Sequence, residues 1–159
     1  MGFLDFLSKR KAYTADDREF FSIIVFGYVS YAVSMAETTL SFLKEELSKD
    51  PTKANSLLSF TYMKGAALLD VFILAKKTVA IIEKEYNLSI LDKYPELAVS
   101  IEEIQYMLDE IGEGISDVSY NEAWNRINLY VKTMIRVYDR KEQFFSCSRA
   151  ITENEVQRR

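Results

Sequence analysis

Histidine is missing from this chain, and the 159 residues include only one cysteine, five glycines and two prolines. Histidine is the usual general base and the commonest metal ligand, so its absence argues against zinc and histidine-containing di-iron sites. The single cysteine, Cys147, cannot form a disulfide within the chain. Paired carboxylates could still act as acid and base, but the sequence shows no such pair and no nucleotide-binding motif. We therefore predict a non-enzymatic protein with no cofactor and no bound metal.

The composition also favours a cytoplasmic protein that does not bind nucleic acid. Asp5 interrupts the first apolar residues, so we do not expect a cleavable secretory signal. The net charge is −4 and the isoelectric point is near 5.0, whereas phosphate binding requires a concentrated basic surface.

The scarcity of glycine and proline is typical of an all-helical chain with few tight turns. The first long helix should cover residues 14–49, with Thr14 capping its first amides. Asp50 and Pro51 should begin a second helix that ends near residue 86. These two helices should form a long antiparallel hairpin.

Two shorter helices should follow. The third should begin at Pro95 and end around Gly112 and Gly114, where glycine can close a helix in the left-handed conformation. The fourth should begin at Ser119, which has the spacing of a capping box with Glu122, and should run to residue 145.

The predicted fold is thus an all-α four-helix bundle that forms a single domain over residues 1–159. Its hydrophobic content of 48% is ample for one core. Residues 146–159 should form a polar C-terminal tail. The inward face of the fourth helix should comprise Trp124, Ile127, Val131, Met134, Ile135 and Tyr138.

The most informative feature is an acidic stretch in the third helix and the segment after it. Between Lys93 and Arg126 there are eight acidic residues and no lysine or arginine. Apolar residues spaced by three and four fix the helical register, and they are Leu97, Ile101, Ile104, Leu108 and Ile111. With these residues inward, the outer face comprises Val99, Glu102, Glu103, Tyr106, Asp109, Glu110 and Glu113.

This acidic face has two interpretations. It could be a solvated surface that keeps the protein soluble. Alternatively, Tyr106 anchors a partner and the acids steer a basic surface into place. The second interpretation predicts a protein that masks or inhibits a basic protein partner, as an immunity protein, an antitoxin or a phage-encoded inhibitor does.

The first helix raises a separate question, because residues 20–36 carry no charge and are apolar on nearly every side. Its small and polar stripe comprises Gly27, Ser30, Ser34, Glu37 and Ser41. The helix could be a central packing element, a self-association surface or a membrane span, although 17 residues cover only about 25 Å. The second helix is also largely apolar, so we expect a homodimer or a partner that covers the excess hydrophobic surface.

The first residues form a short amphipathic segment with an apolar half and a basic half. It comprises Phe3, Leu4, Phe6, Leu7, Lys9, Arg10 and Lys11. Residues 1–13 could dock on the bundle or lie on an anionic membrane surface. The alternative function is therefore a membrane-peripheral helical scaffold protein.

Overall fold

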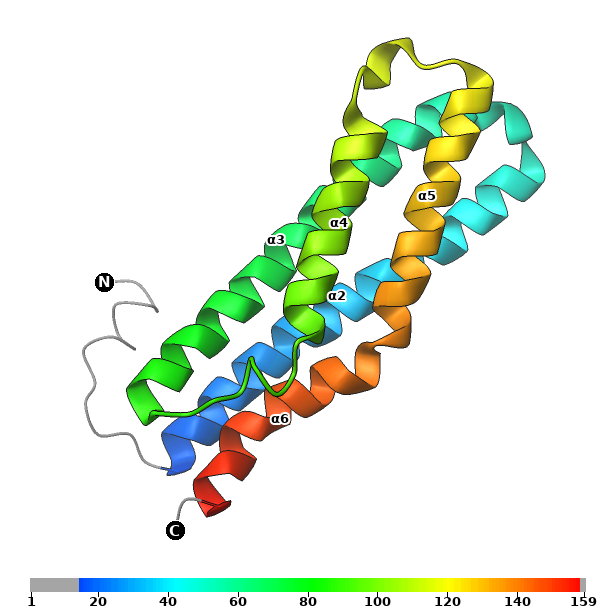
Figure 1. Cartoon of the computed structure of the whole chain (residues 1–159). Coiled ribbons are helices and arrows are strands. Elements are labelled where there is room, and N and C mark those ends of the chain that lie inside the picture. The colour runs from blue at the N-terminus through cyan, green and yellow to red at the C-terminus, as the bar shows by residue number, and fades with distance from the viewer. Residues whose placement is uncertain (1–14, 158–159) are drawn as a thin grey trace, which may run out of the picture.

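Helices account for nearly all of residues 15–157, the part of the chain that the computed structural model describes (Figure 1). This part contains no strand, so the predicted all-helical class is confirmed for it. The elements within residues 15–157 are α2 (Ala15–Lys49), η1 (Pro51–Lys53), α3 (Ala54–Tyr86), α4 (Glu96–Gly112), η2 (Ile115–Asp117), α5 (Tyr120–Asp139) and α6 (Lys141–Gln157). The predicted N-terminal segment from Phe3 to Lys11 and the cap at Thr14 lie outside the described residues.

The two long helices α2 and α3 run antiparallel, joined by η1 (Figure 1). The Asp50 carboxylate accepts a hydrogen bond from the Thr52 amide at 3.1 Å, and Pro51 occupies the first position of the turn. The predicted break at this point is confirmed, although the first turn is 3-10 rather than α. At the far end, Asn87 has a φ of 56° and closes α3 in the left-handed conformation.

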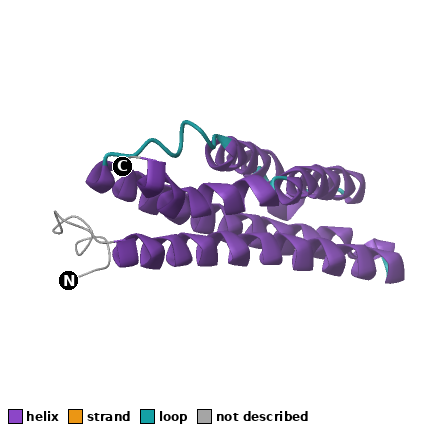
Figure 2. Cartoon of the chain, turned by 90° about the horizontal axis from the view of Figure 1, so that it is seen from below, coloured by secondary structure: helices purple, strands orange, loops and turns teal. Residues whose placement is uncertain are grey.

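The remaining helices form a second layer, and Figure 2 shows the two layers edge-on. Helix α4 packs on α3 and α5 packs on both long helices, while α6 lies along the first half of α2. A close approach between α3 and α4 depends on Gly65, because a Cβ there would lie 3.0 Å from Cδ2 of Leu108. The core therefore lies between the layers, and one side of the α2–α3 pair faces away from it.

The predicted fourth helix is broken, which corrects the expected polar tail after residue 145. Helix α5 ends at Asp139, and α6 leaves in a new direction and lies against α2. Among its described side chains, the apolar ones of Phe144, Cys147, Ala150 and Ile151 are buried. Two polar contacts fix this packing, since the Ser22 hydroxyl donates to the Ser148 carbonyl at 2.8 Å and Arg18 donates to the Ile151 carbonyl at 2.9 Å.

The inward face of α5 is rotated from the predicted one. Ile127 and Met134 are buried as expected, but Ile135 is 46% exposed and Trp124 is only half-buried. The remaining buried positions are Ala123, Tyr130, Thr133 and Val137. Trp124 packs edge-to-face on Tyr120, with ring centroids 6.3 Å apart.

Helix α2 packs against α3, α5 and α6, but only one of its sides is buried in the described structure. Phe21, Val25 and Val29 are buried on one side, whereas Ile23 and Tyr31 on the other are exposed. No helix approaches the small and polar stripe at Gly27, since a Cβ added there would find no heavy atom within 4 Å. By length and composition Asp17–Lys49 could span a membrane, although 39% of its most apolar window is buried.

Candidate functional site

Helix α4 presents the aromatic and acidic residues that the sequence placed on its outer face. Tyr106 is 63% exposed and Val99 is 40% exposed, so their predicted exposure is confirmed. On the opposite side Leu97, Ile104, Leu108 and Ile111 are buried and Ile101 is half-buried. The 3.6-residue period of an amphipathic helix accounts for both sides.

A groove of about 330 Å³ separates the exposed side of α4 from α5. Its lining comprises Val99, Glu102, Glu103 and Tyr106 from α4, and Leu129, Thr133 and Arg136 from α5. The α5 residues were missing from the predicted surface, because helical phase within α4 carries no information on which helix lies beside it. The Thr133 hydroxyl donates to the Leu129 carbonyl at 2.9 Å, so its polar group is satisfied within α5.

Glu103 differs from the other acids of this surface, because it is half-buried and ion-paired. Arg140 donates to both of its carboxylate oxygens, at 2.8 and 3.0 Å, and Arg136 approaches at 3.4 Å. Hydrogen bonds and charge from Arg140 hold the pKa of Glu103 below its usual value. Arg140 also donates to the Ser100 hydroxyl at 3.0 Å. Glu103 thus lines the outer groove, as its helical phase predicted, but it is half-buried and joins α4 to the junction between α5 and α6.

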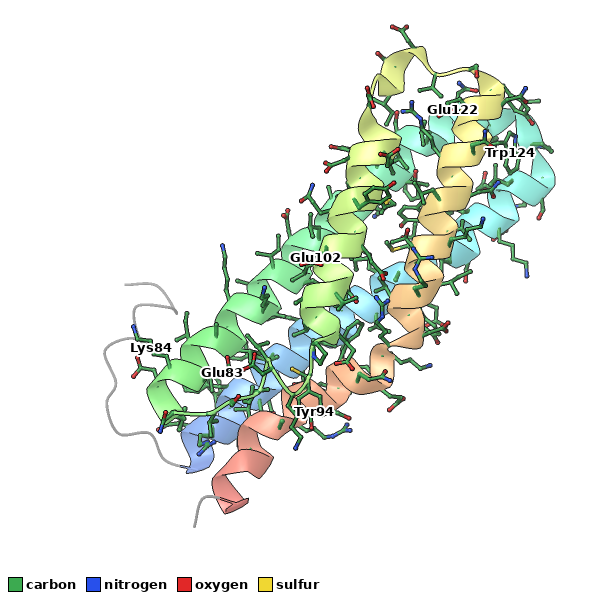
Figure 3. The ribbon with its side chains drawn as sticks, viewed as in Figure 1. Glu83, Lys84, Tyr94, Glu102, Glu122 and Trp124 are labelled. Carbon is green, nitrogen blue, oxygen red and sulfur yellow. The ribbon has the colours of Figure 1, made fainter. Side chains whose placement is uncertain are left out.

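Four acids remain exposed on this surface and form no ion pair with other described residues. They are Glu102, Asp109, Glu110 and Glu113. Figure 3 shows Glu102 on α4, while Glu122 lies at the start of α5. Glu122 pairs with Arg126 at 3.1 Å, and Arg126 also donates to the Ile111 carbonyl. We call Val99, Tyr106 and these four acids the acidic surface.

The described residues provide little for catalysis or for metal binding. Within residues 15–157 no group of three or more histidine, cysteine, aspartate or glutamate side chains could hold a metal ion. Cys147 is buried, and burial followed by the charges of Glu83 and Glu96 raises the pKa of its thiol to about 12. Such a thiol is almost wholly protonated near neutral pH and is a poor nucleophile.

Comparison of the chain with protein-family models, with curated proteins and with solved structures found no match. The chemistry of its own surfaces is therefore the basis for a functional proposal.

Proposed function

We propose that this protein is a non-enzymatic binding module that masks or inhibits a basic protein partner through the acidic surface. The main support is the 63% exposure of Tyr106, a large aromatic residue next to the half-exposed Val99 and four carboxylates that form no ion pair with the described residues. Aromatic side chains are common anchors of protein interfaces, whereas charged side chains around them steer the approach of a partner.

The groove indicates what such a partner would present. An apolar side chain could enter between Tyr106 and Leu129, and lysine or arginine side chains around it could meet Glu102 and Asp109. A guanidinium could also stack on the Tyr106 ring. Because Arg136 and Arg140 already neutralise Glu103, this residue would position the groove rather than attract the partner. A toxin or another basic cytoplasmic protein has this chemistry, as expected for an immunity protein, an antitoxin or a phage-encoded inhibitor.

The test is affinity capture from native lysate with two variants of equal charge. In the first, Glu102, Asp109, Glu110 and Glu113 are replaced by lysine. In the matched control, four exposed acids elsewhere are replaced by lysine: Glu37, Asp92, Asp139 and Glu142. Mass spectrometry then identifies the captured proteins at low and at high salt.

We expect a basic protein to be captured by the wild type and the control variant but not by the first variant. Raising the salt should weaken its capture, because charge steering is screened. Equal losses in both variants would indicate a nonspecific charge effect. Equal capture by all three proteins would contradict the proposal and identify the acidic surface as a solvated one.

A membrane-peripheral scaffold is the second candidate, supported by the exposed apolar side chains of α2. Phe20, Ile23 and Phe26 lie near the start of this helix and are more than 40% exposed. Flotation of the purified protein with phosphatidylserine vesicles would support this function if it needed no protein partner. A protein that stays at the bottom of the gradient would contradict it.

We also infer that the architecture is a four-helix bundle whose fourth helix is broken at Arg140. Helices α5 and α6 cover successive halves of α2, as one continuous helix would in a regular bundle. The test is hydrogen exchange of the variant Arg140→Ala. Continuous protection of the backbone amides from α5 into α6 would support this description.

A further inference from the structure

The α2–α3 pair has a second exposed surface, on the side away from α4, α5 and α6. We call it the outer face, and Figure 2 shows no described element on that side of the pair. Ile23 and Tyr31 of α2 are 62% and 59% exposed, and Met63 and Leu74 of α3 are exposed as well. A soluble monomer rarely leaves several large apolar side chains exposed together on one face.

The outer face is large enough for a stable protein interface. The stretch from Phe20 to Phe42 spans roughly 33 Å at 1.5 Å per residue, and two helices side by side are roughly 20 Å wide. The face thus offers roughly 650 Å² on each copy, close to the ~800 Å² per partner of a standard interface.

The polar residues of the outer face favour a protein over a lipid as its occupant. Ser34 and Thr38 alternate with the apolar residues of α2, and Asp70 is exposed in the middle of α3. A bilayer interior would have to accept this carboxylate and these hydroxyl groups, which is costly. A basic partner would find no acidic residue among residues 20–36 of α2, and Asp70 shares its side of α3 with the cation Lys77.

The charged residues of the outer face can pair with those of a second copy of the same face. Asp70 and Lys77 are both exposed and lie two turns apart on one side of α3, with the exposed Leu74 between them. A two-fold axis that lies in the interface, perpendicular to α3 at Leu74, places α3 antiparallel to its copy. Each Asp70 then meets Lys77 of the other copy. On α2 the same axis brings Ile23 opposite Ser34, a large side chain against a small one.

We propose that a second copy of this chain covers the outer face, with α2 and α3 each antiparallel to their counterparts. This leaves the acidic surface, in the other layer, free on both copies. The dimer would therefore present two acidic surfaces at once.

The first experiment is sedimentation velocity of the full chain over a wide concentration range. We expect a species of twice the 18.4 kDa chain mass. The variant Ile23→Glu should weaken association on the order of a hundredfold, because it buries a charge at the interface. The matched control is Ile135→Glu, which replaces an exposed isoleucine of α5 and should leave association unchanged. Circular dichroism confirms that both variants fold.

A charge exchange tests the register independently. Asp70→Lys should weaken association on the order of tenfold, since attraction becomes repulsion at two symmetric places. The double variant Asp70→Lys with Lys77→Asp should restore it.

Three outcomes would overturn the proposal. They are a wild-type monomer at every concentration, equal disruption by Ile23→Glu and Ile135→Glu, and a double variant that is no better than Asp70→Lys alone. If the monomer also floated with phosphatidylserine vesicles, the outer face would be assigned to a lipid surface instead.

Discussion

The acidic surface and the outer face both expose large apolar side chains, but their surroundings differ. Around Tyr106 lie four carboxylates that form no ion pair within residues 15–157, whereas residues 20–36 of α2 contain no charge. A surface rich in one charge repels its own copy and attracts an oppositely charged partner. The outer face carries charges of both signs, Asp70 and Lys77, among its apolar residues, so it has no such preference and is compatible with self-association. The two layers therefore suit two different kinds of contact.

The largest expected effect comes from breaking the contact between the layers. Phe144 is fully buried and packs on Phe72, with ring centroids 5.1 Å apart. Phe144→Ala should lower the free energy of unfolding by about 3–5 kcal/mol, because it leaves a cavity in the core. The control is Phe145→Ala, since Phe145 is half-buried against Phe26 and should cost less. Denaturant unfolding at one fixed protein concentration measures both, and equal losses would contradict the assigned packing of α6.

The next effect separates the two surfaces. Tyr106→Ala should weaken partner binding by about 2 kcal/mol, as expected for an aromatic anchor. Because Tyr106 is exposed, the free energy of unfolding should change by less than about 0.5 kcal/mol. Self-association should be unaffected, since Tyr106 lies in the other layer. Calorimetric titration with the captured partner and sedimentation provide the two readouts; unchanged partner affinity would rule out Tyr106 as an anchor.

A smaller effect is expected at the junction that shapes the acidic surface. Arg140→Ala removes the paired bonds to Glu103 and the bond to Ser100, and should cost about 1–2 kcal/mol of unfolding free energy. Arg149→Ala is the control, because Arg149 is exposed and its bond to the nearby Ser146 hydroxyl, at 3.3 Å, lies within α6. If the two variants were equally stable, Arg140 would have no role in holding α4 to α5.

The smallest effect is a pH dependence. The pKa of Glu103 is lowered from 4.5 in the folded protein, so its contribution to stability is present above pH 4.5. That contribution is lost as the pH falls through the folded-state pKa. Compared with Glu103→Gln, the wild type should be more stable by about 1 kcal/mol at neutral pH, because solvent screens this half-buried pair. Urea unfolding of both proteins from pH 7 to pH 3 should show the difference in unfolding free energy between them decreasing. A difference that stays constant would exclude the ion pair as its cause.

Much of the helical organisation was predictable because it depends on local chemistry. Asp50 with Pro51 marks the start of a turn, and Ser119 accepts from the Glu122 amide at 3.2 Å, as its spacing indicated. The reciprocal half of the capping box was not found, since the Glu122 carboxylate pairs with Arg126 instead. Gly114 has a φ of 58°, the left-handed conformation expected after α4.

What could not be predicted depends on contacts between helices. The break at Arg140 has no glycine or proline to mark it, and it coincides with bonds to Glu103, 37 residues away. The apolar spacing of Phe144, Cys147 and Ile151 was the available signal for α6. Likewise, the phase of α2 was uncertain because residues 20–36 are apolar on nearly all sides. Helical phase did identify the exposed part of the acidic surface, where one face of α4 is distinctly polar.

The contacts between α2 and α6 also have a consequence for the order of folding. Arg18 and Ser22 bond to residues 133 and 126 positions further along the chain. Closing so long a loop is entropically costly and slows folding relative to local helix pairing. During synthesis, α2 and α3 can pair early, but the apolar side of α2 stays open until α6 has left the ribosome. The nascent chain would thus expose two apolar sides of α2 at once, and it would be most prone to aggregation at that stage.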